Sequence, residues 1–434
     1  MSTDPILRVD ALEKHYPITE GVLRNEVGRV RAVDGISFDV SRGETVGIVG
    51  ESGCGKSTAA TSLLRLEDPT GGDVYFDGDD ITKYDSGELK RFRRRAQMIF
   101  QDPTSSFDPR MTIGESIAEP LLIHGMRDKS RRREIVTDLL ERVGMSADDI
   151  DRYPHEFSGG QKQRIGLARA LSVNPDLIVA DEPVSALDVS VQAEILNLID
   201  DIQEEFGLGI VFISHNMGVI REVCDRVNVM YLGEIVESAP TDELFENPQH
   251  PYTKALLGSI PQPDPTKRGD SVTLTGDVPS PSNPPSGCRF HTRCPTVIQP
   301  EDYDFDQEAW RAVMDVRVQL RDSGIDLDAV KTFLGVPEDA SESELPHEEM
   351  KDAIRDEFDV PDTLGDAGAE RVFENALDEL VRDDQDEARE LLEAEFETVC
   401  ERDAPPLERT EAGHPAACHL HSEDMARTLN PADD

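Results

Sequence analysis

The sequence holds 434 residues and is strongly acidic, with 89 Asp and Glu against 44 Lys and Arg and a formal net charge of −45. The negative electrostatic field of such a chain repels the phosphate backbone of nucleic acids, so the composition argues against a nucleic-acid-binding protein. No apolar run approaches the roughly 18 residues of a membrane-spanning helix, and the first residues lack the basic start and apolar stretch of a signal peptide. We therefore expect a cytoplasmic chain of two or three domains.

The first element with a chemical signature is a glycine-rich loop at residues 50–57, which matches G-x-x-x-x-G-K-[ST]. A strand pattern precedes it and a helix pattern follows, which turns backbone N–H groups and a helix dipole toward a phosphate. The alternative is a chance glycine-rich turn before a helix. Lys56 is expected to reach the β- and γ-phosphates and Ser57 to ligate Mg²⁺. The residues expected to hold nucleotide are Gly50, Glu51, Ser52, Gly53, Cys54, Gly55, Lys56, Ser57 and Thr58.

A second anion-binding pattern, SGGQKQR at residues 158–164, opens another predicted helix. Its serine and two glycines offer a hydroxyl, bare N–H groups and the positive end of a helix dipole. An ordinary N-cap with a glycine-rich approach is the alternative. The chain already has a phosphate loop, and this second segment lacks a phosphate-loop lysine. We therefore expect it to contact a nucleotide that is bound by another subunit.

Two predicted strands deliver polar side chains at their ends. The run LIVADEP, residues 177–183, carries Asp181 and Glu182, and the run GIVFIS, residues 209–214, leads to His215. The carboxyl ends of parallel strands form the ligand-binding edge of a sheet. Asp181 is expected to hold Mg²⁺ through its water shell, and Glu182 to polarise the water that attacks the γ-phosphate. Taken alone, such motifs are also compatible with a solvated strand end and a surface histidine.

Much of the acidity lies in one stretch near the C-terminus. Residues 301–400 contain 33 acidic and 9 basic residues, a net charge of −24. Apolar residues at helical spacing in RVFENALDEL and ARELLEAEFETV favour a small acidic helical insert over a disordered segment. The residues outside this stretch are also acidic, and the whole chain has only 10 Lys. Both features suggest a proteome adapted to high internal salt. A simply acidic soluble protein is the alternative.

Six motifs in order resemble the ATP-binding cassette (ABC) ATPases: the phosphate loop, FQDP around Gln101, SGGQKQR, LIVADEP, SALD at residues 185–188, and ISHN around His215. The resemblance implies two such domains that enclose two ATP molecules head to tail. It implies that Gln101 couples the Mg²⁺ site to the membrane subunits, that His215 contacts the γ-phosphate, and that Asp188 lies at the dimer seam. Tyr16 would stack on adenine, with a half-buried core position as the alternative. The partner's ATP would be contacted by Ser158, Gly159, Gly160 and Gln161.

Downstream, ENPQHPYTKALLGSIP at residues 246–261 looks like the oligopeptide/dipeptide importer ATPases, a group that includes nickel importers, and the chain resembles the second ATPase subunit of those systems. This implies peptide import powered from the cytoplasmic face of the membrane, with a related ATPase, two permease subunits and an extracellular binding protein. A nickel or other small-solute importer is the alternative. A cassette ATPase of DNA maintenance is disfavoured, because only about a hundred residues, without sustained heptads, separate the phosphate loop from SGGQKQR.

The predicted fold class is α/β, with the phosphate loop, Asp181 and Glu182 on the core sheet. We predict an ATPase domain over residues 1–262, including a helical subdomain at about 92–170, and a C-terminal domain over residues 263–434. An acidic helical insert at about 300–398 interrupts the C-terminal domain and has no counterpart in the family that the rest of the sequence resembles.

Four cysteines fall in the predicted C-terminal domain, with Cys288 and Cys294 before the insert and Cys400 and Cys418 after it. Disulfides are a poor explanation in a reducing cytoplasm, and two unrelated pairs of buried thiols are the plain alternative. Four thiolates suit Zn²⁺ or an iron–sulfur cluster, and spacing alone does not choose between them. Importers of this subfamily are similar in carrying a 4Fe–4S cluster, so the resemblance favours the cluster, in a structural role.

Overall fold

A computed structural model describes residues 4–21, 24–102, 106–260, 276–303, 306–337 and 346–422. The chain forms two compact units. Unit 1 comprises residues 1–268, 279–284 and 407–416, and unit 2 comprises residues 269–278, 285–406 and 417–434. The domain boundary predicted near residue 262 lies outside the described residues. Within the described ranges, no helix is long and apolar enough to cross a membrane.

Unit 1 is built on an eight-stranded sheet in which β6, β7, β8, β3 and β9 run parallel. Its strands, in sheet order, are β11 (Glu408–Arg409), β12 (Pro415–Ala416), β10 (Glu234–Pro240), β9 (Arg226–Tyr231), β3 (Thr45–Val49), β8 (Gly209–Ser214), β7 (Leu177–Asp181) and β6 (Ala96–Ile99). Strands β3, β7 and β8 are buried along their whole length, as continuous apolar sequences predict for a parallel sheet covered on both faces. Their carboxyl ends therefore meet at one edge of the sheet.

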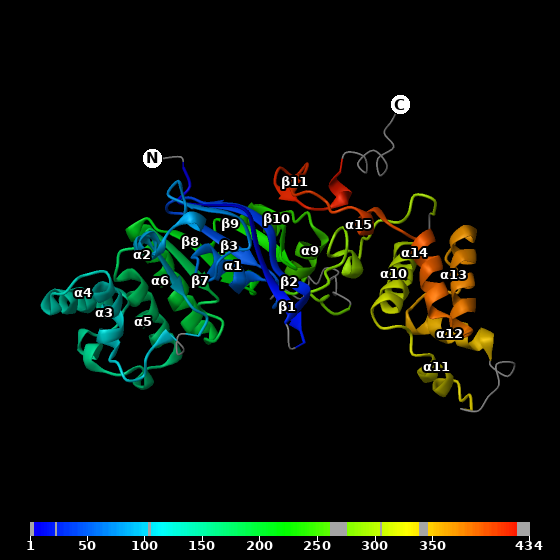
Figure 1. Ribbon diagram of the computed structural model, residues 1–434, viewed down its shortest axis with the longest axis horizontal. Coiled ribbons are helices and arrows are strands. Elements are labelled where there is room, and N and C mark those ends of the chain that lie inside the picture. The colour runs from blue at the N-terminus through cyan, green and yellow to red at the C-terminus, as the bar shows by residue number, and fades with distance from the viewer. Residues whose placement is uncertain are drawn as a thin grey trace. The chain divides into compact units, whose positions relative to one another are not determined.

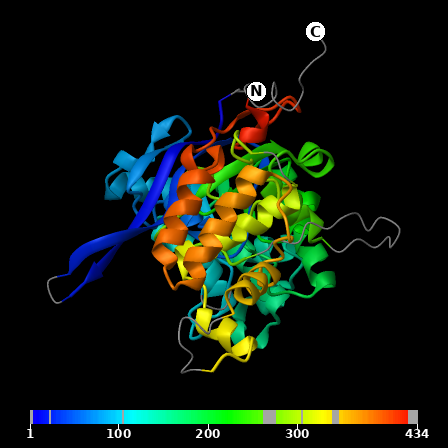
Figure 2. The same cartoon turned by 90° about the vertical axis from the view of Figure 1, so that its right-hand side faces the viewer.

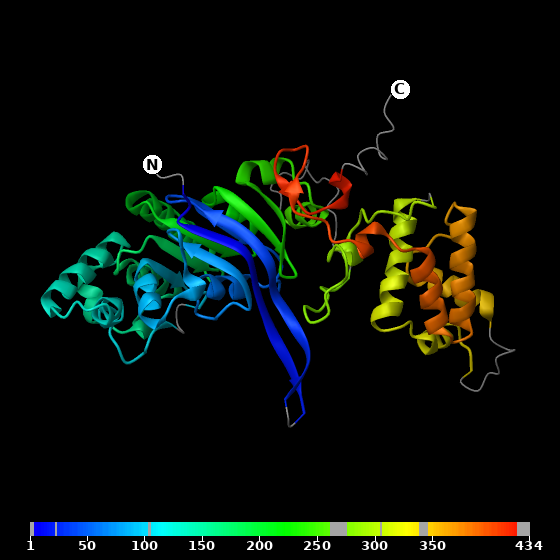
Figure 3. The ribbon, with the colours of Figure 1, turned by 45° about the horizontal axis from the view of Figure 1, so that its top comes forward.

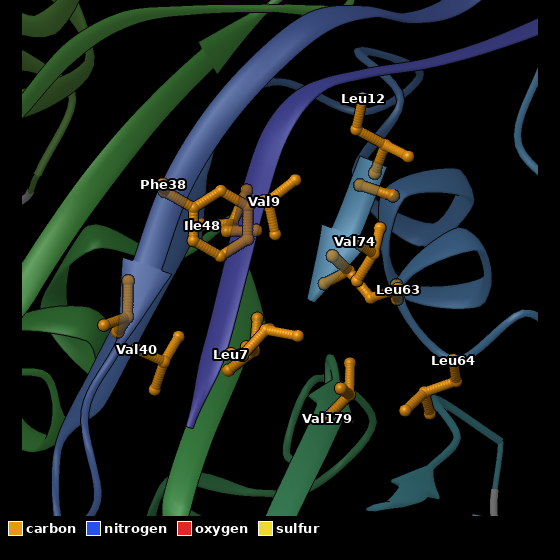
Figure 4. Packing of buried hydrophobic residues seen from close by; sticks show 14 of the residues in the cluster. Leu7, Val9, Leu12, Phe38, Val40, Ile48, Leu63, Leu64, Val74 and Val179 are labelled. Carbon is orange, nitrogen blue, oxygen red and sulfur yellow. The ribbon is translucent and has the colours of Figure 1, made fainter. Parts of the chain in front are cut away.

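A second, antiparallel sheet has the order β2, β1, β4, β5. Its strands are β1 (Leu7–Glu20), β2 (Asn25–Val40), β4 (Gly71–Phe76) and β5 (Asp79–Asp80). Figure 3 shows β1 and β2 as a long two-stranded ribbon that extends well past the rest of this sheet. Helix α1 (Lys56–Leu63) contacts strands of both sheets. The core of unit 1 lies here, where Leu7, Ile48, Leu63 and Val74 are completely buried (Figure 4).

The chain between β5 and β7 is mostly helical. Its helices are α2 (Ser86–Arg95), α3 (Ile113–Ile123), α4 (Lys129–Arg142) and α5 (Gly159–Leu171). Helices α3, α4 and α5 pack on one another (Figure 1). Side-chain caps fix where α2 and α3 begin. The side chains of Asp85 and Thr112 each accept a backbone N–H, and the backbone N–H of each donates to the side chain of the glutamate three residues later.

Four further helices lie in the described part of unit 1: α6 (Val189–Phe206), α7 (Met217–Val223), α8 (Thr241–Glu246) and α9 (Pro251–Gly258). Helix α6 buries Ile195, Ile199 and Ile202 on one face and ends at Gly207, whose φ of 63° suits a glycine. Helix α9 begins at a proline, which needs no N–H partner in the first turn.

Unit 2 is helical, with α10 (Gln307–Asp322), α11 (Leu327–Phe333), α12 (His347–Glu357), α13 (Ala367–Val381), α14 (Gln385–Glu395) and α15 (Val399–Arg402). Helices α13 and α14 lie side by side (Figure 2). Trp310 is completely buried and its ring meets that of Phe396 edge to face at 5.9 Å. The apolar spacing of RVFENALDEL places Phe373 and Leu377 among the buried residues of α13.

Candidate functional site

Four parallel strands bring the predicted site residues to one edge of the large sheet. Strand β3 leads into the phosphate loop, β7 into Glu182, β8 into His215 and β6 toward Gln101. The register matches these ends, because Val49 lies opposite Ser214. Glu182, His215, Gln101 and the phosphate loop line one cavity of about 600 Å³. The phosphate loop, Gln101, Glu182 and His215 thus meet around a single cavity.

Two glycines of the phosphate loop allow approaches that no side chain would permit. A Cβ on Gly50 would lie 2.1 Å from the carbonyl oxygen of Met230. Gly55 has a φ of 106°, and a Cβ there would lie 1.8 Å from the carbonyl oxygen of Ala32. The loop therefore needs glycine at both positions to pass between β2 and β9.

The loop lysine and the metal-binding candidates lie at the start of α1. The Lys56 side chain is buried, and its ammonium group donates hydrogen bonds of 2.8 Å to the carbonyl oxygens of Gly50 and Glu51. The Ser57 hydroxyl donates to Asp181 Oδ1 over 3.2 Å. Burial raises the pKa of Asp181, and the hydrogen bond from Ser57 acts in the opposite direction. A hydroxyl and a carboxylate oxygen placed together are oxygen donors of the kind that Mg²⁺ prefers.

Glu182 is held on both carboxylate oxygens. Gln101 Nε2 donates to Oε2 over 2.9 Å, and His215 Nδ1 lies 3.0 Å from Oε1. Because a carboxylate only accepts, Nδ1 is the protonated nitrogen of His215 in this arrangement. The backbone of Glu182 has a φ of 45°, a conformation that costs energy for a residue with a side chain and that recurs at active sites. The carboxylate is therefore fixed toward the cavity.

Residues outside the predicted motifs complete the cavity wall. They are Val30 and Ala32 of β2, Leu256 of α9, and Pro281. Sequence reasoning missed all four, because a strand residue or a proline at a cavity wall has no local signature. The HPYT sequence that opens α9 is the one signal near Leu256, and it indicates the importer subfamily without indicating a cavity wall.

Tyr16 is not among the residues that line this cavity. Its hydroxyl donates to Glu67, and the ammonium group of Lys14 lies 5.0 Å from its ring centre. Burial and the hydrogen bond to Glu67 raise the pKa of Tyr16. Its stacking on adenine stays a prediction.

The SGGQ segment and Asp188 serve as helix caps in this chain. The Ser158 hydroxyl accepts the N–H of Gln161 at 3.3 Å, and the Gln161 side chain accepts the N–H of Ser158 at 2.9 Å. A Cβ on Gly160 would lie 2.4 Å from Val191 Cγ1, so this glycine also lets α5 approach α6. Asp188 caps α6. Ser158 and Asp188 are exposed and do not line the cavity, so contacts of this segment with a partner's nucleotide stay a prediction.

The four C-terminal cysteines lie near one another in unit 2. No disulfide joins any of the six cysteines, all of which lie in the described residues. The Cys288 N–H donates to the Cys400 carbonyl at 2.8 Å. Burial raises the pKa of Cys288, and the neighbouring Cys294, Cys400 and Cys418 raise it further. In the described part of the chain, however, no group of three or more His, Cys, Asp and Glu side chains is arranged to hold a metal ion, so the metal centre stays a prediction.

A phosphate loop between a buried parallel strand and a helix, with an acidic pair ending a nearby strand, defines a P-loop ATPase. Family models agree with this class. The ABC transporter family matches residues 33–185, the oligopeptide/dipeptide transporter C-terminal region matches residues 236–299, and a domain of unknown function, DUF8228, matches residues 307–413.

Curated relatives are closely similar. A probable peptide ABC transporter ATP-binding protein of Sinorhizobium fredii is 54% identical over 68% of this chain and 84% of its own length. The oligopeptide transport protein AppF of Bacillus subtilis is 52% identical over 68% and 90%, and the dipeptide transport protein DppF of Escherichia coli is 47% identical over 69% and 92%. The chain belongs to the ATP-binding subunits of the oligopeptide/dipeptide ABC transporters.

Proposed function

We propose that this chain hydrolyses ATP to drive the import of oligopeptides or dipeptides. It would act at the cytoplasmic face of the membrane with a related ATPase, two permease subunits and an extracellular binding protein. Relatives named for peptide, oligopeptide and dipeptide transport support this role. The observation that carries the hydrolytic step is the position of Glu182, whose carboxylate is held by Gln101 and His215 in the same cavity as Lys56.

In this proposal the N–H groups of the phosphate loop and Lys56 bind the phosphates of ATP. Ser57, Asp181 and Gln101 would hold Mg²⁺, which would neutralise charge on the phosphates. Glu182 accepts a proton from the attacking water, and His215 contacts the γ-phosphate.

The isolated chain is expected to hydrolyse ATP slowly, because its cavity lacks the wall that the SGGQ segment of a second ATPase would supply. Assembly with the partner ATPase, the permeases and the binding protein in lipid vesicles should raise turnover, and added peptide should stimulate it further. Steady-state phosphate release and peptide uptake are the measurements. An isolated monomer that turns over at the rate of the complete transporter would contradict this proposal.

Ser158→Arg provides the matched variant. The isolated variant should bind ATP like the parent chain, since Ser158 does not line its own cavity. In the assembled transporter, turnover should fall at least about twofold, because one of two nucleotide sites loses a wall that positions the phosphates.

We also propose that Cys288, Cys294, Cys400 and Cys418 hold one metal centre, a 4Fe–4S cluster in preference to Zn²⁺. Two features support this: none of the four cysteines forms a disulfide, and Cys294, Cys400 and Cys418 lie close enough to Cys288 to raise its pKa beyond the effect of burial. The side chains would have to turn toward a common point to bind the centre. A four-thiolate clip would restrain a segment that runs from residue 294 to residue 400.

Anaerobic purification is expected to give a brown protein with about four iron atoms per chain. The Cys288→Ser, Cys418→Ser double variant should lose the colour and the iron and keep ATP binding, whereas Cys224→Ser, a buried thiol of unit 1, should keep both. Iron analysis and visible absorbance are the measurements. A colourless protein with one zinc would select Zn²⁺, and a protein without metal would contradict the proposal.

A further inference from the structure

A tyrosine from outside the ATP-binding motifs touches the phosphate loop. The N–H of Glu51 donates a hydrogen bond of 2.8 Å to the hydroxyl oxygen of Tyr252, which lies in the first turn of α9. Tyr252 is completely buried, and its ring centre is 4.7 Å from that of Tyr231, at the end of β9. The position of this hydroxyl is therefore set by packing and not by solvent.

This contact acts on the first peptide of the phosphate loop. The carbonyl oxygen of that peptide, on Gly50, accepts a hydrogen bond from Lys56, and the N–H, on Glu51, is taken by Tyr252. Gly50 also lies against β9, because a Cβ on this residue would be 2.1 Å from the carbonyl oxygen of Met230. In the proposed function Lys56 also binds the phosphates of ATP, so its bond to the Gly50 carbonyl competes with nucleotide. The bond from Glu51 N–H to Tyr252 has no such competitor and can hold the peptide when ATP is bound.

The start of α9, and with it Tyr252, is fixed by one buried carboxylate. Glu237 of β10 has a fully buried side chain. Its Oε1 accepts the N–H of Gln249 at 2.7 Å and its Oε2 accepts the N–H of His250 at 2.9 Å. His250 in turn caps α9, since its Nδ1 accepts the N–H of Tyr252 at 3.1 Å. A shift of Glu237 would therefore move the tyrosine.

The remaining partner of Glu237 comes from the far end of the chain. His414, which is 3% exposed, places Nε2 at 2.8 Å from Glu237 Oε1. It lies in the turn of the β11–β12 hairpin, and β12 pairs with β10 at Glu237 itself. This hairpin belongs to unit 1, although the chain reaches it only after residues 285–406 of unit 2.

We propose that Tyr252 is a positioning residue for ATP binding, and that the Glu237–His414 pair couples the C-terminal hairpin to the phosphate loop through it. Docking of the hairpin holds Glu237, Glu237 holds the start of α9, and Tyr252 holds the loop in its phosphate-binding shape. The inference rests on the proposed binding of ATP at this loop.

The first test is Tyr252→Phe, which keeps the ring and removes the hydroxyl. The dissociation constant of the full chain for Mg²⁺–ATP, measured by calorimetry, should rise about fivefold to tenfold, because the buried N–H of Glu51 loses its partner. In the assembled transporter, KM for ATP should rise by a similar factor with kcat changed less than about twofold, since the contact is away from the attacking water. Tyr84→Phe, which removes an exposed hydroxyl bonded to Asp79 at 3.4 Å, should leave the dissociation constant unchanged.

The hairpin is tested by His414→Ala and His414→Gln. The alanine variant loses the donor to Glu237 and should weaken ATP binding about threefold, whereas the glutamine variant keeps an N–H at a similar reach and should restore most of the affinity. Combined with Tyr252→Phe, His414→Ala should add almost nothing, because both act through the same contact. Circular dichroism identifies any variant that has failed to fold.

Two results would overturn the inference. One is a Tyr252→Phe chain that folds and binds ATP within about twofold of the parent. The other is a His414→Ala effect that adds fully to that of Tyr252→Phe. A parent chain that does not bind ATP would instead refute the proposed function, so the two failures are distinct.

Discussion

Replacing Glu182 with glutamine is expected to lower ATP hydrolysis by about 10²–10⁴-fold while ATP and Mg²⁺ still bind. Glutamine keeps the size of the side chain and retains one oxygen that accepts a hydrogen bond. It removes the negative charge and the basicity needed to take a proton from water. Phosphate release by the assembled transporter at saturating ATP is the measurement.

The geometry explains why the loss should be confined to the chemical step. The Glu182 carboxylate is bonded to Gln101 and His215, whereas the phosphate-binding groups are Lys56 and the N–H groups of the loop. Glu222→Gln, an exposed carboxylate on the helix after His215, is the matched control and should turn over normally. Near-normal turnover in Glu182→Gln would mean that another group activates the water.

The sequence predicted the centre of the site well because its residues follow short buried strands. Once β3, β7 and β8 are parallel neighbours, the phosphate loop, Glu182 and His215 must share one edge. The wall of the cavity was not predictable in the same way. Val30, Leu256 and the contact from Tyr252 depend on how β2 and α9 pack against the loop, and no local pattern records such a tertiary contact.

In the acidic helices of unit 2, too, the sequence predicted the local structure but not the tertiary contacts. The spacing of apolar residues predicted helices where α13 and α14 are found. It did not predict how so many carboxylates are accommodated. Lys351 of α12 is largely buried and lies within 3.3 Å of Glu374 and 2.5 Å of Asp378 of α13. Burial alone would lower the pKa of Lys351, but these two carboxylates raise it to about 12. One lysine of α12 thus offsets part of the charge of two carboxylates on α13.

Arg317 is the other position at which one substitution should have a large effect, here on the stability of unit 2. Its side chain is 5% exposed and carries a charge into the interior of unit 2. The guanidinium donates to the Phe396 carbonyl at 2.8 Å and to both Glu401 oxygens at 2.9 and 3.2 Å. It therefore joins α10 to the end of α14 and to α15. Arg317→Met keeps the length of the side chain but leaves a poorly solvated carboxylate and a carbonyl without this partner.

Arg317→Met is expected to lower the free energy of unfolding of unit 2 by about 3–5 kcal/mol, the usual cost of removing one member of a buried ion pair. The chain has one tryptophan, and Trp310 is buried in the same helical layer, so its fluorescence during urea unfolding reports on unit 2 alone. Arg321→Met is the matched control on the same helix, because its pair with Asp322 is exposed and should contribute about 0.5 kcal/mol or less. A midpoint for Arg317→Met equal to that of the control would show that the apolar contacts around Trp310 hold unit 2 without the ion pair.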